Sequence, residues 1–145
     1  MLSNLFSPNP ILIPVLVLVL WSLVMAVWML FARMQAMNAA GMDPQAGARA
    51  IDLGAKLPAA AQTKADNYNH LMEQPTIFYA LALTLAIAGM GTGLNLTCAW
   101  IYVGARIIHS LIQSTVNIVI LRFSVFMIAT IALAVMAINA AMKML

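Results

Sequence analysis

Residues 11–32 read ILIPVLVLVLWSLVMAVWMLFA, a run of 22 residues without a charged side chain. Because about 20 apolar residues are needed to cross the hydrocarbon core of a bilayer as a helix, this run predicts a transmembrane span. A cleaved signal peptide is the alternative, but no basic segment precedes the run, which is also longer than the apolar region of such peptides. Arg33 follows directly and closes the span where a guanidinium can reach the lipid headgroups.

The rest of the chain is similarly apolar. Of its 145 residues, 64% are hydrophobic and 8% are charged, which leaves too little polar surface to cover a soluble globule. The seven Lys and Arg residues are scattered and are not interleaved with aromatic residues, so we expect no nucleic-acid partner. A single cysteine, Cys98, predicts no internal disulfide, and no Cys/His spacing typical of a metal site is present. We therefore expect an all-α integral membrane protein with one domain, residues 1–145.

Three further segments are long and apolar enough to be read as spans, so we expect a four-helix bundle. The four predicted spans cover about residues 11–32, 67–90, 96–115 and 118–142. A polar loop at about residues 35–66 separates the first two and contains Arg49, Lys56 and Lys64. The positive-inside rule places this loop in the cytoplasm, which predicts a multi-pass membrane protein. No internal repeat is apparent, which disfavours a transporter.

Ionisable side chains lie inside two of these spans. Arg106 and His109 are one helical turn apart in the third span, and Glu73 lies in the second. At a rise of about 1.5 Å per residue, antiparallel spans bring all three to similar depths. Because a charge at mid-bilayer costs about 2.5–3.5 kcal/mol, we expect Glu73 to be the partner of Arg106.

Polar residues on the two spans form matching stripes. Asn69 and Glu73 share one helical face, and Arg106, His109 and Gln113 share another. This spacing predicts a hydrated cleft that opens toward the cytoplasm. Spacing alone leaves two alternatives open: polar contacts that only join the helices, and a path for protons or ions through Glu73 and His109.

Two arginines are expected at the mouth of the cleft. Arg33 ends the first span, and Arg122 lies in the first turn of the fourth. At that position the Arg122 guanidinium adds to the positive end of a helix dipole and to free backbone N–H groups, an arrangement that suits an anion or a thiolate.

At these residues the chain resembles the MAPEG family, the membrane-associated proteins in eicosanoid and glutathione metabolism. The resemblance is carried by the four spans, the long polar loop, the Asn69, Glu73, Pro75 and Phe78 pattern, and the Arg-x-x-His of the third span. The spacing from this motif to Arg122 is similar to that of the microsomal prostaglandin E synthase branch. The segment before Pro75 looks more like bacterial members, which implies a bacterial inner membrane.

The resemblance implies a homotrimer that binds glutathione as co-substrate between subunits. It assigns thiolate stabilisation to Arg122 as the catalytic residue, which is chemically reasonable because a free thiol has a pKa of about 8.5 and is mostly protonated at neutral pH. The residues expected to hold the peptide are Arg33, Asn69, Glu73, Arg106, His109 and Gln113.

Two positions depart from the family pattern. Gln113 stands where catalytic branches commonly carry tyrosine, and Phe123 stands where the prostaglandin synthase branch has serine. Both argue against prostaglandin or leukotriene synthesis. We expect a membrane-bound glutathione transferase or peroxidase that acts on lipophilic electrophiles, and the alternative is a non-catalytic membrane scaffold or subunit.

Overall fold

The computed structural model describes residues 8–48 and 50–145, so Arg49, one of the basic residues of the predicted loop, lies outside the described residues. The elements are α1 (Leu12–Ala39), the 3-10 helix η2 (Pro44–Gly47), α2 (Ala50–Gly54), α3 (Ala59–Met72), α4 (Pro75–Ile87), α5 (Gly93–Ser114) and α6 (Val119–Met144). No strand occurs in this part of the chain, and the predicted all-α class is confirmed.

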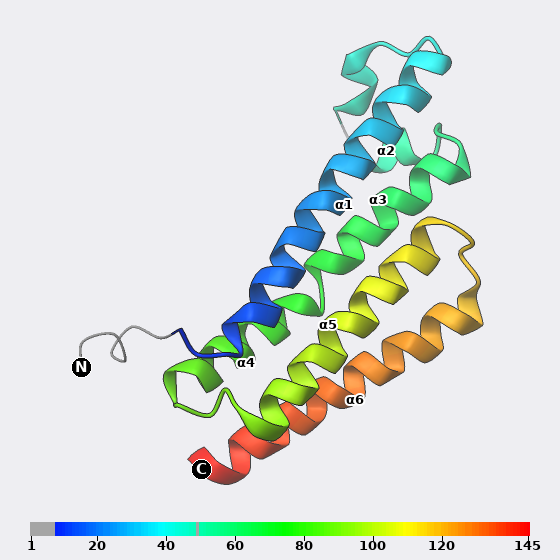
Figure 1. Ribbon diagram of the computed structural model, residues 1–145. Coiled ribbons are helices and arrows are strands. Elements are labelled where there is room, and N and C mark those ends of the chain that lie inside the picture. The colour runs from blue at the N-terminus through cyan, green and yellow to red at the C-terminus, as the bar shows by residue number, and fades with distance from the viewer. Residues whose placement is uncertain (1–7, 49) are drawn as a thin grey trace.

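The long helices form an elongated bundle (Figure 1). Its consecutive rods, each made of one long helix or of α3 and α4 together, run in opposite directions. Helix α1 runs one way, α3 followed by α4 runs back, α5 returns and α6 runs back again. Helix α5 packs along α6 and also contacts α1 and α3. This central position makes α5 the helix around which the others are arranged.

The polar segment between the first two rods is largely helical. Helix α1 continues to Ala39 and α3 begins at Ala59, so that only η2, α2 and short turns lie between them. A small apolar cluster fixes this segment: its buried members are Leu53, Leu57 and Ala61, with Ala36, Met37 and Met42 packed against them. The extension of α3 into the predicted loop adds two turns of helix to the segment that carries the polar residues of the second rod.

The second rod is broken near its middle, where the sequence predicted one continuous span. Helix α3 ends at Met72 and α4 begins at Pro75. Proline has no N–H to donate to the carbonyl of Leu71, and its ring clashes with the preceding turn, so the helix is interrupted here. The last carbonyls of α3 therefore lack partners within the helix.

The core lies between α1, α4, α5 and α6. At its centre the rings of Phe78 and Tyr102 stack with centroids 4.4 Å apart and an interplanar angle of 17°. Other large buried side chains of this cluster are Leu18, Met25, Leu71, Leu85 and Met136. At the far end Gly91 is required by close packing, because a Cβ there would overlap the side chain of Asn9.

Apolar side chains cover much of the outer surface. Helices α1 and α6 are the two described helices that are long and apolar enough to cross a membrane, and only 17% and 22% of their most apolar stretches are buried within the protein. Core helices of a soluble protein would be mostly buried, whereas these helices present rows of exposed Leu, Ile, Val and Phe. Helix α5 is less apolar than α1 and α6, because Arg, His, Gln and Ser side chains lie on its buried face.

Candidate functional site

A cavity of about 230 Å³ lies between α3, α5 and the first turns of α6. It is lined by His70, His109, Gln113, Val119, Arg122, Phe123 and Phe126. Three of the predicted site residues, His109, Gln113 and Arg122, are therefore brought together. The cavity includes the first turns of α6, next to the α5–α6 turn. This turn lies toward the end of the bundle that carries the polar segment (Figure 1).

Arg122 is positioned by the turn that precedes α6. Its Nη1 donates a hydrogen bond to Oδ1 of Asn117 at 2.9 Å. Asn117 adopts a positive φ of 50°, a conformation that asparagine tolerates better than most residues. Ile118, the N-cap of α6, provides no side-chain cap, so first-turn N–H groups remain available beside the guanidinium. Arg122 thus combines a half-buried cation with the positive end of a helix dipole.

His70 is a site residue that the sequence reasoning missed. Its ring lies 4.9 Å from the ring of His109 and 5.3 Å from that of Phe126, measured between centroids. Both histidines line the cavity beside Arg122. The sequence did contain a signal: Asn67, His70 and Gln74 follow one another at intervals of three and four residues, which places them on one face of a helix.

Arg106 is completely buried and contacts the C-terminal turn of α3, next to the break between α3 and α4. Its Nη2 donates to the backbone carbonyl of His70 at 2.7 Å and lies 3.4 Å from Nδ1 of the same residue. Among the described residues its Nε and Nη1 have no hydrogen-bond partner. The guanidinium also lies 5.7 Å from the ring centre of Phe126.

The expected pair between Arg106 and Glu73 does not form. No ion pair joins them within the described part of the chain, and Glu73 is exposed. The physical reason is the helix break: α3 ends at Met72, which carries Glu73 off the predicted face and leaves the His70 carbonyl free for Arg106.

Three predicted residues lie away from the cavity. Asn69 and Glu73 are exposed, and Arg33, at the same end of the bundle on α1, is half-buried outside the cavity lining. Besides the bond from Arg106 to the His70 carbonyl, a fully buried polar contact between α3 and α5 is made by Asn67, whose Nδ2 donates to Oγ of Ser110 at 2.8 Å.

The cavity has the chemistry of an anion or thiolate site. Arg122 supplies a cation, and the buried Oε1 of Gln113 has no donor among the described residues, so it can accept a hydrogen bond from a bound group. Its volume of about 230 Å³ is below the roughly 300–1,000 Å³ typical of sites for drug-sized ligands. A single chain can therefore enclose only part of a ligand the size of a tripeptide.

The fold and the site define an all-helical protein of a membrane, with a basic polar cavity at one end of its bundle. The chain matches the sequence model of the MAPEG family over residues 11–142 and belongs to that family, as the resemblance predicted. Neither the curated proteins nor the solved structures contain a significant match to this chain.

Proposed function

We propose that the protein is a membrane-bound, glutathione-dependent transferase or peroxidase that acts on lipophilic electrophiles. Membership of the MAPEG family supports a glutathione-related function. The observation that carries the proposal is the cavity in which Arg122 shares its lining with His70, His109 and Gln113. In this proposal glutathione is a co-substrate and Arg122 is the catalytic residue.

The proposed role of Arg122 is to stabilise the glutathione thiolate. A fixed cation beside a helix N-terminus favours the ionised thiol, which is the nucleophile. In a transfer reaction the thiolate sulfur forms a bond to an electrophilic carbon while the leaving group departs with its electron pair. In a peroxidase reaction the thiolate sulfur attacks the terminal oxygen of a hydroperoxide, the O–O bond breaks, and the alkoxide leaves and is protonated to an alcohol. A second glutathione then converts the sulfenic acid to a disulfide and water.

Lipophilic substrates would approach from the bilayer side. Val119 and Phe123, two of the cavity-lining residues, are also exposed on the outer surface of α6. An apolar electrophile dissolved in the hydrocarbon region can therefore reach the thiolate beside Arg122 without crossing water. The proposed substrate class follows from this apolar side of the cavity.

A homotrimer completes the proposed site. The cavity of one chain is smaller than a tripeptide requires, whereas Asn69, Glu73 and Arg33 lie outside it. Packing of a neighbouring chain against the outer face of α3 would bring these residues to the exposed part of glutathione. Carboxylates of the peptide then pair with arginine, and its ammonium group pairs with Glu73.

The test is an assay of purified protein in detergent with glutathione and either an activated aryl halide or a lipid hydroperoxide. We expect glutathione-dependent turnover that falls about 10²–10³-fold in Arg122→Ala, the usual effect of removing one group that stabilises developing or fixed negative charge. Lys143→Ala is the matched control, because it removes an exposed cation from the last turn of the same helix. Wild-type protein without glutathione-dependent turnover of either substrate would contradict the proposal.

A non-catalytic scaffold is the second candidate, and one observation favours it: Arg106 is used inside the protein, bonded to the His70 carbonyl. A scaffold predicts no effect of glutathione on thermal unfolding. A ligand that binds only the folded state stabilises it by about 2.7 kcal/mol at a hundred times its Kd. A rise in melting temperature with millimolar glutathione therefore excludes the scaffold, and an unchanged melting temperature supports it.

A further inference from the structure

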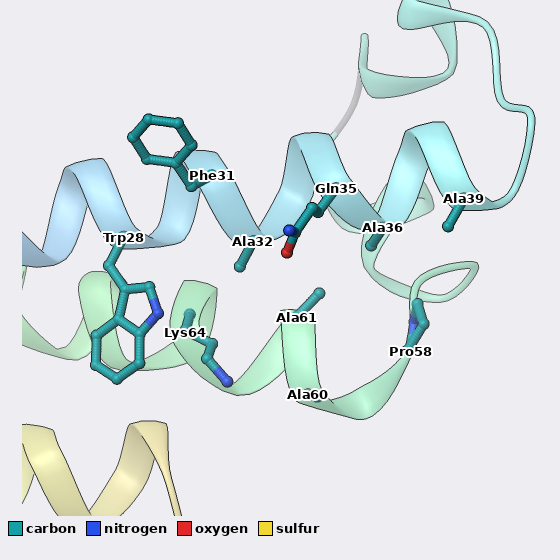
Figure 2. Close-up of a pocket in the computed structure, with 10 residues that line it drawn as sticks. All are labelled: Trp28, Phe31, Ala32, Gln35, Ala36, Ala39, Pro58, Ala60, Ala61 and Lys64. Carbon is teal, nitrogen blue, oxygen red and sulfur yellow. The ribbon is translucent and has the colours of Figure 1, made fainter.

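Both histidines of the chain lie in the cavity beside Arg122. Histidine is the side chain that ordinarily gains and loses a proton near neutral pH. A larger hollow of about 650 Å³ between α1 and α3 (Figure 2) is lined mainly by alanine and aromatic side chains, and Lys64 is the one ionisable group among its described lining residues. Groups suited to proton transfer are therefore gathered in the cavity, where the contacts of each ring decide what it can do.

Arg106 fixes which ring nitrogen of His70 carries the proton. Its Nη2 lies 3.4 Å from Nδ1 of His70 and donates to the backbone carbonyl of the same residue at 2.7 Å. A guanidinium has donors and no acceptor, so Nδ1 of His70 accepts and carries no proton. The ring proton is then on Nε2, and His70 is a neutral donor whose other nitrogen is already engaged.

Nε2 of His70 is free to donate to a ligand. No described residue accepts a hydrogen bond from it, and no hydrogen bond joins His70 to His109, although their ring centroids are 4.9 Å apart. In an imidazole the two nitrogens lie on opposite sides of Cε1, so Nε2 is directed away from the arginine that holds Nδ1. The N–H of His70 is thus available inside the cavity that its ring lines.

His109 is the complementary group, a buried ring with unused nitrogens. It is 4% exposed, and neither nitrogen has a hydrogen-bond partner among the described residues. Buried polar groups normally have partners, so an unpartnered ring in a cavity indicates a bound group. None of the described lining residues is a carboxylate, and neither a guanidinium nor an amide is basic enough to take a proton. His109 is therefore the lining residue with a nitrogen free to accept one.

We propose that the two histidines divide the handling of the glutathione proton, an inference that rests on the proposed function. Arg122 stabilises a thiolate but has no lone pair for the proton. His109 takes the proton of the thiol as general base, and the electron pair of the S–H bond stays on sulfur. His70 donates its Nε2–H to the thiolate, and Arg106 is the positioning residue that keeps this N–H in place.

The proton on His109 leaves in the second half of the reaction. In the peroxidase reaction the departing alkoxide takes it and becomes the alcohol. In a transfer reaction with a halide as leaving group, the proton passes to water. Both routes return His109 to the neutral ring that accepts the next proton.

The experiment is nitrogen-15 NMR of the detergent-purified protein labelled at histidine. The chain has two histidines, so His109→Gln assigns both rings. The chemical shift of each ring nitrogen reports whether it carries a proton, which differs between the two tautomers. Without ligand we expect His70 to be protonated at Nε2 alone. Saturating glutathione should protonate both nitrogens of His109, whereas S-methylglutathione, which has no thiol proton, should leave that ring neutral.

The outcomes separate this inference from the proposed function. His70 protonated at Nδ1 would overturn the inference, as would a His109 ring that stays neutral while glutathione shifts the histidine signals saturably. Glutathione binding would stand in both cases. Glutathione that shifts neither ring at any concentration would overturn the proposed function and this inference with it.

Turnover distinguishes the base from the donor. His109→Gln keeps a polar side chain but removes the base, so we expect kcat to fall about 10²-fold while KM for glutathione changes by less than about twofold. His70→Gln retains an N–H donor and should lose less activity than His70→Leu. An unchanged kcat in His109→Gln would overturn the assignment of the base, and equal losses in the two His70 variants would overturn that of the donor.

Discussion

His70 is the residue at which the candidate site and the helix break meet. Its ring lines the cavity and lies 4.9 Å from that of His109, while its backbone carbonyl accepts the hydrogen bond from Arg106 at 2.7 Å. The backbone contact depends on the end of α3, and the ring contact depends on the face of α3 that turns toward α5. A change of the side chain therefore removes a cavity group and leaves the backbone contact in place.

We predict that His70→Ala weakens glutathione binding about tenfold, which is about 1.4 kcal/mol and lies within the range expected for one lost hydrogen bond. Equilibrium titration calorimetry of the detergent-purified protein measures this change. Asn139→Ala is the control, since Asn139 is also a partly buried polar residue but contacts Asn95 at the other end of the bundle. An unchanged affinity for glutathione in His70→Ala would contradict the assignment of His70 to the ligand cavity.

At the scale of the elements, α3 and α5 are joined by buried polar contacts. Asn67 and Ser110 are both fully buried, and the hydrogen bond between them is 2.8 Å long. A second link runs from Gln74, whose Nε2 donates to Oγ1 of Thr130 at 3.0 Å and whose Oε1 lies 3.4 Å from the Tyr102 hydroxyl. These contacts fix the helices that carry the cavity residues.

We predict a coupling free energy of about 0.6 kcal/mol, and at most about 1.7 kcal/mol, between Asn67→Ala and Ser110→Ala in a double-mutant cycle. The modest value is expected because polar groups of an unfolded chain within a membrane also find partners. The measurement is the free energy of unfolding of the four variants in mixed micelles. Strictly additive effects of the two substitutions would show that the hydrogen bond does not join the helices.

Some features of these helices could be predicted from the sequence, and others could not. The uncharged run 11–32 predicted α1 by its length and apolar composition. The spacing of Arg106, His109 and Gln113 predicted the inner face of α5 by helical periodicity. Pro75 was a sufficient signal for the break between α3 and α4. The contact of Arg106 with the His70 carbonyl could not be predicted in the same way, since it depends on which carbonyl the break leaves without a donor.

At the scale of the whole molecule, the exposed apolar faces of α1 and α6 require an apolar environment. Leu23 is near the middle of the run 11–32 and is 59% exposed. In water such a residue tolerates replacement by arginine, whereas at the centre of a bilayer an arginine costs about 2.5–3.5 kcal/mol. The same substitution therefore distinguishes the two environments.

We predict that Leu23→Arg sharply lowers the fraction of chains inserted in the membrane, as measured by carbonate extraction of membranes from expressing cells. Met34→Arg is the matched control, because Met34 is similarly exposed on α1 but follows the uncharged run. Equal insertion of the two variants would contradict the assignment of α1 as a membrane-spanning helix.

The proposed function depends on whether Arg122 stabilises a bound thiolate, and the ultraviolet difference absorbance of the thiolate during a glutathione titration at neutral pH measures this directly. The account predicts a saturable thiolate signal for wild type that persists in Lys143→Ala. In Arg122→Ala the signal should be lost at neutral pH and recovered only at higher pH, because the fixed cation that favours the ionised thiol is gone. The absence of a saturable signal in wild type, or an unchanged signal in Arg122→Ala, would contradict the account.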